Sequence, residues 1–467
     1  MKSLKKNLGS ISILVLLIGV VTAITIGGLA VTAGTVYTAS VRSDAYERAL
    51  SLAQAGAEYY RWHLAHAPTD FKDGTSNPGP YTHTLSDPYG NTDGSFRLTI
   101  DPPASGSSIV TITSEGWLAG SPNTIRKVIT RYGKPSLAKY AFLHNANVWF
   151  GTKIDIHGKV FSNGGIRMDG THDSTVQSAK ATYTCGSETG CSPATTKNGV
   201  WGEGGPQNLW QFPVTSVDFN SVAVDFSAMK TAAQSSGTYL APSGTYGYHI
   251  LFSSDGNYTV KKVTSATNKK GWSVEKHCES LNQIISNETA IGTYSISTKP
   301  LIFAEDTLWI EGVVNGRATV VAAKFPLDIN DMNIWIPNNV TYVAKDSTNS
   351  LGIIAQNNII YGLRVPQIFE INAALLAQKG RILRHNYKVS GCSVQSEAVR
   401  QKLIIYGSVI SNQKSYWNFG QGSAGFGSVP VSGFSQREIT YDSSLYYSPP
   451  PYFPSQGEYE FISWEER

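Results

Sequence analysis

The first strong pattern in the chain is a long run of apolar residues near its start. Residues 11–36 are mainly Ile, Leu, Val, Ala and Gly, and the 35 positions between Lys6 and Arg42 carry no formal charge. Because a helix of about 20 residues crosses the hydrocarbon of a bilayer, this run is long enough to span a membrane. No second stretch of comparable hydrophobicity follows it. We therefore predict a single transmembrane helix over residues 10–40.

The charges that flank this run predict its orientation. Lys2, Lys5 and Lys6 precede it, whereas the far side opens with mixed charges from Arg42 to Arg48. The positive-inside rule then places residues 1–9, a basic leader, in the cytoplasm and the bulk of the chain outside. The alternative is a signal peptide cleaved after Ala33, before Gly34. A signal peptide has a shorter apolar region, of about 7 to 15 residues, so we expect the helix to be retained.

The apolar run leads directly into an amphipathic pattern. Between Val41 and Leu64 there is no Pro, and small or apolar residues recur at helical spacing: Ala45, Ala49, Leu52, Ala53, Ala57, Tyr60 and Leu64. This pattern predicts that the membrane helix continues outward and packs one face against a globular head. Residues 67–94 are rich in Gly, Pro, Asp, Ser and Thr, which predicts a loop.

Three β-rich runs follow, at residues 96–100, 109–113 and 124–131. They predict a small antiparallel sheet that covers the apolar stripe of the helix, so residues 41–135 should form one unit. Downstream, Val217 to Gln234 fits a helix with Val222, Phe226, Met229 and Ala233 on one face, and we expect this helix to cap a sheet.

Residues 136–440 have the texture of a large, mainly-β domain. The sequence Gly158-Lys-Val-Phe-Ser-Asn163 recurs as Gly407-Ser-Val-Ile-Ser-Asn412, and Gly312-Val-Val-Asn-Gly316 is a degenerate third copy. Such recurrence favours β-solenoid-like stacking, with an inward Val in each rung and Gly or Asn at the corner. The uneven spacing of the copies leaves a β-sandwich as the alternative. Residues 441–467 form an aromatic and Pro-rich tail, which either folds back on the domain or serves as a polyproline ligand.

Composition narrows the class of protein. The 467 residues are 41% hydrophobic and 15% charged, which excludes disorder along most of the chain. A net charge of +4 over so large a surface predicts no nucleic-acid partner. An extracytoplasmic location makes the cysteines candidates for disulfides, Cys185 with Cys191 and Cys278 with Cys392, and four free thiols are the alternative.

The N-terminal half of this pattern resembles the minor pilin-like proteins of type IV pilus assembly. The resemblance rests on Gly9-Ser10 after the basic start, the apolar run, and the segment from Ala45 to Glu58. It implies cleavage by a prepilin peptidase after Gly9, which would make Ser10 the first mature residue. The usual Glu at the fifth mature position is replaced by Leu14, so a plain uncleaved anchor stays as an alternative. Ser114-Glu115-Gly116 stands where such proteins often carry a Ser-x-Gly turn.

A second resemblance involves the large domain. The stretch from Ser347 to Ile359, the segment Ala373 to Ala377 and the tail resemble the extracytoplasmic domain behind the pilin-like anchor in some of these assembly proteins. This resemblance implies a location at the cell surface or in a pilus. It supplies no biochemical role for the domain.

Motifs that would carry chemistry are weak. Gly420, Gly422 and Gly425 match G-x-G-x-x-G, but Pro430 follows and no helix can start cleanly. His63 and His66 lack further residues at metal-ligand spacing. His157, Asp169, His172 and Asp173 form the densest polar cluster, and turn capping explains them better than acid–base work. We expect no catalytic, cofactor-binding or metal site.

Together these patterns predict a membrane-anchored α+β protein with a long N-terminal helix, a small pilin-like antiparallel sheet and a large mainly-β domain. We expect a non-enzymatic structural or assembly component of a type IV pilus-like envelope system, with membrane lipid and other pilin-like subunits or pilus assembly proteins as partners. Gly19, Gly27, Gly28 and Gly34 would permit close helix packing. The alternatives are a tethered adhesin-like protein that binds carbohydrate or another surface, and a polysaccharide-active β-helix enzyme.

Overall fold

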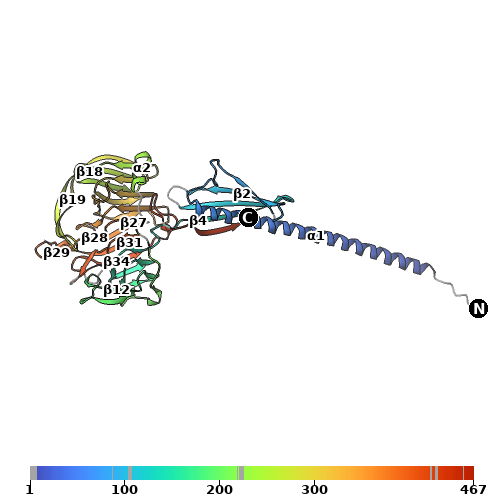
Figure 1. Cartoon of the computed structure of the whole chain (residues 1–467), viewed down its shortest axis with the longest axis horizontal. Helices are drawn as coiled ribbons and strands as arrows, with labels where there is room; N and C mark the ends of the chain where they lie inside the picture. Colours follow the sequence, from blue (N-terminus) through green and yellow to red (C-terminus); the bar gives the residue numbers. More distant parts are fainter. Residues whose placement is uncertain are drawn as a thin grey trace, which may run out of the picture. The chain divides into compact units, whose positions relative to one another are not determined.

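The computed structural model of the chain (Figure 1) describes residues 8–86, 88–103, 108–217, 219, 226–420, 423–425, 430–455 and 457–467. The chain divides into two compact units. Unit 1 comprises Met1–Pro102, Val110–Gly133 and Tyr459–Arg467, and unit 2 comprises Pro103–Ile109 and Lys134–Glu458. The large unit is thus inserted, in sequence, between the last two strands of the small one.

Unit 1 is built from one long helix and one antiparallel sheet. Helix α1 runs without interruption over Leu8–His66. The sheet has the order β1-β2-β3-β4-β35, formed by β1 (Tyr81–Ser86), β2 (Thr92–Asp101), β3 (Ile109–Leu118), β4 (Ser121–Gly133) and β35 (Glu460–Glu466). The predicted long helix is confirmed. The three predicted strands are also confirmed, as β2, β3 and β4 at the centre of the sheet. The edge strands β1 and β35 lie in the expected loop and tail. Their side chains are mostly exposed, so they lack the alternation that marks a strand.

The second half of α1 packs on this sheet through small residues. The face predicted from Ala45 to Leu64 is buried at all seven positions. A Cβ at Gly116 of β3 would overlap the backbone of Ala49 and Ala53, and a Cβ at Gly56 would overlap Phe96 and Ser114. Helix and sheet backbones therefore approach closely. The expected turn at Ser114–Gly116 is wrong, because these residues lie inside β3, where Gly116 makes room for the helix.

Unit 2 is mainly β and its longest sheet has 21 strands, paired mostly in parallel. Besides α2 (Phe226–Ser236) and short 3-10 turns at η1 (Ser187–Thr189), η2 (Gln207–Leu209), η3 (Ser396–Ala398) and η4 (Ser443–Leu445), its strands are β5 (Phe142–His144), β6 (Val148–Phe150), β7 (Ile154–His157), β8 (Val160–Ser162), β9 (Ile166–Met168), β10 (Thr171–His172), β11 (Val176–Ser178), β12 (Thr182–Cys185), β13 (Thr195–Asn198), β14 (Val200–Trp201), β15 (Trp210–Gln211), β16 (Thr238–Leu240), β17 (Gly247–Ser253), β18 (Asn257–Ser273), β19 (His277–Ser295), β20 (Leu301–Ala304), β21 (Leu308–Val314), β22 (Arg317–Ala322), β23 (Ile334–Ile336), β24 (Val340–Tyr342), β25 (Ser350–Ala355), β26 (Ile359–Tyr361), β27 (Ile368–Ala377), β28 (Ile382–Arg384), β29 (Lys388–Val389), β30 (Ser393–Val394), β31 (Val399–Ser411), β32 (Asn418–Gly420), β33 (Ser423–Gly425) and β34 (Gly433–Thr440).

The parallel pairings run as ladders through unit 2. One ladder follows β16-β20-β22-β25-β27-β31-β5-β8-β11-β15. A second follows β24-β27-β31-β34-β7-β10, and a third follows β21-β23-β26-β28. Strands of the first ladder are buried on both faces, as in β25, which is typical of parallel sheets. A large, mainly-β region is therefore confirmed.

The recurring G-x-V motif occupies equivalent places in the ladders. Val160 and Val409 both pair with Phe142 of β5, so the two complete copies lie in register on either side of that strand. Asn145 bridges them, because its side chain bonds to Asn412 at 2.9 Å and to Asn163 at 2.8 Å. At Gly407, where φ is 147°, a Cβ would overlap the carbonyl oxygen of Ala373. Only Gly tolerates that backbone conformation and that approach.

Helix α2 covers part of the first ladder. Its buried residues Phe226, Met229 and Ala233 are three of the four predicted, and Val222 lies outside the described residues. The predicted start at Val217 is wrong. Val217 is not helical, since its N–H donates to Asn163 Oδ1 at 2.9 Å and its carbonyl accepts from Asn163 Nδ2 at 2.6 Å.

A long antiparallel pair, β18–β19, covers another part of unit 2 and is called here the strap (residues 257–295). Figure 1 shows it as a curved ribbon at the edge of the unit. Its tip, residues 274–276, is followed by Cys278, which is bonded to Cys392 near β30. Beneath the strap lies an apolar cluster with one residue from each successive strand or bridge: Trp335, Ile360, Leu383 and Tyr416.

Residues of the tail divide between the units. Phe453 is buried in unit 2, and Arg317 of β22 donates to the carbonyl oxygens of Ser448 and Pro449 at 3.1 and 2.6 Å. The last residues form β35 of unit 1.

Candidate functional site

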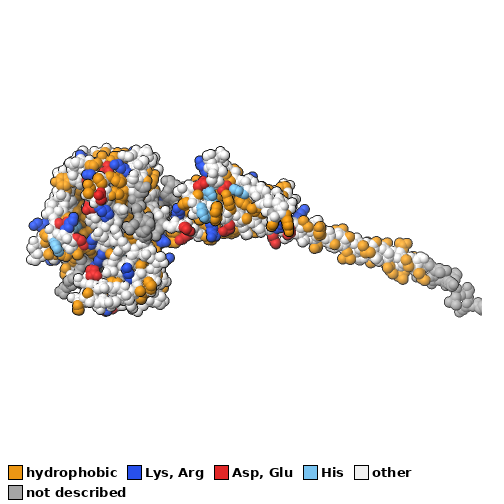
Figure 2. Space-filling view, viewed as in Figure 1, with side chains coloured by type: hydrophobic (Ala, Val, Ile, Leu, Met, Phe, Trp, Pro, Cys, Tyr) orange, Lys and Arg blue, Asp and Glu red, His pale blue; other side chains and the backbone are white. Residues whose placement is uncertain are grey.

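The first candidate site is the exposed half of α1. All residues from Ile11 to Asp44 are exposed, and Leu29, for example, keeps 69% of its surface. This stretch belongs to a helix that is long and apolar enough to cross a membrane. On the face seen in Figure 2 it carries hydrophobic and uncharged side chains until charged residues begin near its inner end. A continuous apolar surface of this kind is typical of an interaction with lipid or with other helices.

The predicted helix-packing glycines all lie on this exposed half. A Cβ added at Gly19, Gly27, Gly28 or Gly34 would meet nothing within 4 Å. The surface at these four positions is open within the part of the chain that the structure describes, in contrast to Gly56 of α1 and Gly116 of β3, which lie where helix and sheet meet. The predicted processing pair, Gly9 and Ser10, lies in the first turn of α1.

The cysteines form two disulfides in unit 2. Cys185 pairs with Cys191, and Cys278 pairs with Cys392. These are the two pairs named from the sequence. The first closes a short loop around η1, and the second ties the strap to the loop beside β30 over a separation of 114 residues.

The polar cluster predicted around His157 separates into different contacts. His157 bonds through Nδ1 to Asp173 Oδ2 at 2.8 Å, and the N–H of Gly158 donates to Asp173 Oδ1 at 2.9 Å. The hydrogen bond that His157 donates to Asp173 raises the pKa of His157, and burial acts against this shift. Asp169 instead accepts from Trp149 and Arg167 at 2.7 and 2.8 Å. These carboxylates have the contacts of turn and ion-pair residues.

The other candidate ligands are also engaged locally. His172 accepts from Trp210 Nε1 at 3.0 Å, and burial lowers its pKa. His63 contacts Asp70 at 3.0 Å, and His66 contacts the carbonyl oxygen of Trp62 at 2.8 Å. No group of three or more His, Cys, Asp or Glu among the described residues could hold a metal ion. In the glycine-rich motif, Gly422 lies outside the described residues.

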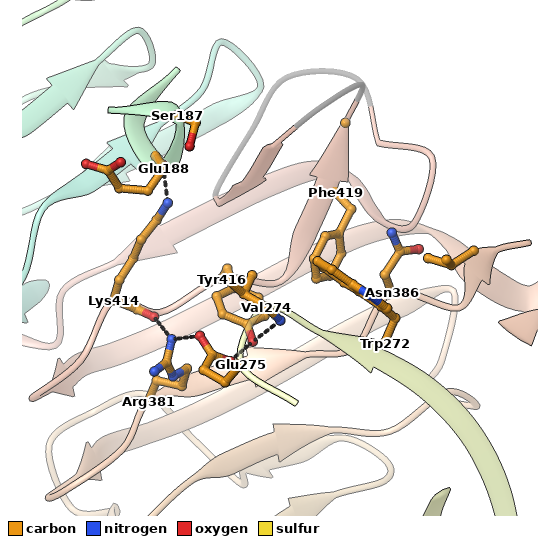
Figure 3. A pocket seen from close by; sticks show the side chains of 12 residues that line it. Ser187, Glu188, Trp272, Val274, Glu275, Arg381, Asn386, Lys414, Tyr416 and Phe419 are labelled. Carbon is orange, nitrogen blue, oxygen red and sulfur yellow. Dashed lines mark hydrogen bonds and ion pairs between the residues drawn. The ribbon is translucent and has the colours of Figure 1, made fainter. Parts of the chain in front are cut away.

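A second candidate site, not predicted from the sequence, is a groove in unit 2 beside the tip of the strap. Two cavities, of about 510 and about 270 Å³, share Glu275 and Arg381 in their walls. Figure 3 shows the larger one, where Arg381 contacts Glu275 and Tyr416 OH donates to Glu275 Oε2 at 2.6 Å. Trp272 and Phe419 meet edge to face at 5.9 Å and form an aromatic wall. We call the two cavities together the strap groove.

The floor of the strap groove is a polar column that runs across the parallel strands. Asn333 Oδ1 accepts from the N–H of Asn358 at 3.0 Å, and Asn358 Oδ1 accepts from the N–H of Arg381 at 3.0 Å. The column ends at Lys414, whose ammonium donates to the carbonyl oxygen of Glu188 and whose pKa is lowered to about 8 by burial. These residues come from distant parts of the sequence, with no motif that links them.

Comparison with known proteins gives a weak structural likeness. No protein-family model and no curated protein matches the chain. Among solved structures, it is similar to the competence-associated pilin ComZ from Thermus thermophilus, with 14% sequence identity over 91% of this chain and 97% of that one. The TM-score is 0.29, so this likeness assigns no residue and no ligand.

Proposed function

We propose that the chain is a structural or assembly component of a type IV pilus-like envelope system, acting by helix packing and surface display rather than by catalysis. The observation that carries this proposal is the division of α1. Its first half is apolar and exposed, and its second half is packed on a small antiparallel sheet through alanines and glycines. One helix then joins an apolar environment to a folded head.

The apolar half of α1 would lie in the membrane before assembly and against other pilin-like helices after it. Without water, helices associate through close backbone contact, which small residues permit. Gly27 and Gly28 offer such a place near the middle of the exposed half. The positive leader favours a cytoplasmic start, and the two disulfides fit an extracytoplasmic location for unit 2.

Unit 2 would be the displayed part, and we infer that its parallel ladders stack as a β-solenoid. Support comes from the in-register copies of the G-x-V motif around β5 and from the asparagine bridge between Asn412, Asn145 and Asn163. The inward valines Val160, Val314 and Val409 all belong to the same buried core. A stack of this kind presents long, regular outer faces to the exterior.

The test combines the mass of the mature chain with its association in the native membrane. Cleavage after Gly9 should give a product that starts at Ser10, as measured by mass spectrometry. Gly27→Leu and Gly28→Leu should reduce the recovery of partner pilins with the full-length chain, because the added side chains keep neighbouring helices apart. Gly120→Leu serves as the control, because a Cβ at Gly120 meets nothing within 4 Å. Gly74 has similar open space, but its positive φ would strain a leucine there. An intact start together with unchanged recovery would contradict the proposal.

A second candidate function is that of a membrane-tethered adhesin-like protein that never enters a filament. The strap groove favours it, since a lined cavity on the displayed unit is a place for a ligand. The state of Gly9 separates the two functions, because an adhesin on a plain anchor needs no prepilin cleavage.

A further inference from the structure

The strap groove has the construction of a ligand site. Its larger cavity is lined partly by Trp272, Tyr416 and Phe419, and its smaller cavity by Trp335, His385 and the asparagines of the polar column. Ligand sites typically combine apolar walls with a few polar groups that fix orientation. The groove therefore offers both surfaces that a polar ligand with an apolar face requires.

A buried nitrogen in the smaller cavity lacks a partner. His385 is 3% exposed, and its Nε2 lies 3.1 Å from Glu279 Oε1, which also accepts from Ser273 Oγ at 2.8 Å. Among the described residues, none forms a hydrogen bond with His385 Nδ1. Because an ionised carboxylate only accepts, Nε2 carries a hydrogen, and Nδ1 is an acceptor in the neutral ring or a donor in the charged ring. Nδ1 is itself buried, so His385 acts on the groove by holding Glu279 in place rather than by contact with a ligand.

The charged side chains that line the groove nearly balance, with four acidic residues (Glu188, Glu275, Glu279 and Asp331) and three basic ones (Lys276, Arg381 and Lys414). Glu275 contacts Arg381, Asp331 contacts Lys379 at 2.9 Å, and Glu279 contacts His385. Burial works against ionisation of Glu279, but the hydrogen bonds from His385 and Ser273 lower its pKa. A strongly anionic or cationic ligand would find little net opposite charge here. The walls carry both hydrogen-bond donors and acceptors, among them Arg381 and the asparagines, which suits a neutral ligand that carries many hydroxyl groups.

The groove is elongated across the parallel strands. Four residues form the polar column, one for each neighbouring strand or bridge: Asn333, Asn358, Arg381 and Lys414. Each lies two residues before one of the paired residues of the apolar cluster, Trp335, Ile360, Leu383 and Tyr416. Neighbouring strands are about 4.8 Å apart, so four positions span about 14 Å. This length exceeds a single sugar ring and fits a short chain of them.

We propose that the strap groove binds a neutral oligosaccharide, whose hydroxyl groups bond to the polar column, Glu275 and Glu279 and whose apolar ring faces pack on Trp272 and the neighbouring aromatic side chains. This inference is independent of the role of α1, so the groove can fail as a site while the assembly function stands.

The test uses the full-length chain in detergent, with cellohexaose, maltohexaose and chitohexaose as probes and isothermal titration calorimetry as the readout. We expect one of these probes to bind. Glu275→Ala should weaken its binding about tenfold or more, because the variant removes a hydrogen-bond partner from the wall of the groove. The matched control is Glu438→Ala, since Glu438 is also half-exposed and also contacts a cation, Lys402, outside the groove.

A second pair of variants tests the aromatic wall. Trp272→Ala should also weaken binding about tenfold or more, whereas Trp210→Ala, in another cavity of unit 2, should leave affinity within about twofold. Thermal unfolding reports whether each variant folds, and Glu275→Ala keeps the test decisive if Trp272→Ala does not. Failure of all three probes to bind at millimolar concentration, or equal losses in the groove and control variants, would overturn the proposal.

Two further measurements identify the kind of ligand. Affinity should not change between low and high salt, because a neutral ligand releases no counterions. Binding should also shift the ¹⁵N resonances of the His385 ring, because its partner Glu279 gains a hydrogen bond from the ligand. Tighter binding of polyphosphate than of any oligosaccharide, with a steep loss in salt, would show an anion site and overturn the proposal.

Discussion

The two halves of α1 belong to one continuous helix but differ in what surrounds them. From Ala45 onward the helix buries a stripe of small residues against β2, β3 and β4, and Leu64 at its end is 1% exposed. In the first half Leu29 keeps 69% of its surface, and the other large exposed apolar residues between Ile11 and Val41 keep between 49% and 70%. Apolar surface left in water costs about 25 cal/mol per Å². The packed half is therefore complete within the chain, whereas the exposed half requires lipid or another helix.

The comparison teaches that glycine has opposite roles along the same helix. In the packed half a Cβ at Gly56 would overlap its neighbours, so the glycine is needed by this chain's own fold. In the exposed half Gly27 and Gly28 have open space around them. Glycine costs stability inside a helix, and the proposed packing against other helices would compensate for that cost in the exposed half.

The largest expected effect comes from filling the close approach in the packed half. Gly116→Ala places a Cβ against the backbone of Ala49 and Ala53. Backbone atoms cannot move aside as a flexible side chain can, so we expect unit 1 to lose about 3 kcal/mol, the upper end of the cost of overpacking. Thermal unfolding of the full-length chain in detergent measures this loss.

The control for Gly116→Ala is Gly120→Ala, which changes the turn after the same strand. A Cβ at Gly120 meets nothing within 4 Å, so stability should stay within about 0.5 kcal/mol. Equal unfolding of the two variants would mean that helix and sheet are less closely packed than described.

The next effect compares one leucine from each half. Leu64→Ala removes a buried side chain from the cluster with Tyr60, Phe96 and Leu98, and we expect a loss of about 2 to 3 kcal/mol from the cavity that remains. Leu29→Ala makes the same chemical change where the side chain is exposed. It should leave the unfolding of unit 1 unchanged. A loss of similar size in both variants would show that the first half of α1 is also part of the folded head.

Much of this comparison could be predicted from the sequence, because helical periodicity is a local property. The stripe from Ala45 to Leu64 and the central strands β2, β3 and β4 follow from residue spacing alone. The edge strands could not be predicted from residue spacing, since exposed strands such as Tyr81–Ser86 carry polar residues on both faces. The order of strands in unit 2 depends on pairings between distant segments, such as Val409 with Phe142, and no local pattern contains that information.

The strap groove could not be predicted for the same reason. Glu275, Arg381 and Tyr416 come together only because the strap crosses the third ladder and is tied there by Cys278 and Cys392. The G-x-V copies are the exception. They are distant in sequence but similar in composition, so their equivalence could be read before their pairing was known.

The smallest expected effect concerns the loop that follows the packed half of α1. Asp70 Oδ1 accepts from the N–H of Lys72 and Oδ2 from the N–H of Gly74, both at 2.7 Å. The hydrogen bond from the N–H of Lys72 lowers the pKa of Asp70. Burial acts against this shift, and the hydrogen bonds from Gly74 and His63 add to it. The ionised carboxylate therefore stabilises the fold above the ordinary pKa of about 3.9. This stabilisation is lost as the pH falls through the lowered pKa of the folded state.

Asp70→Asn should accordingly cost about 1 kcal/mol at neutral pH, the worth of a typical hydrogen bond that is weakened. The difference between the variant and the natural chain should shrink as the pH falls below about 4. Asp44→Asn is the matched change on the exposed half of α1, and it should leave unfolding unaffected at every pH. Chemical or thermal unfolding between pH 7 and pH 3 checks both. A constant difference across that range would mean that Asp70 stabilises the loop by its shape and not by its charge, because the charged form accepts more strongly from the two amide donors than the neutral form does.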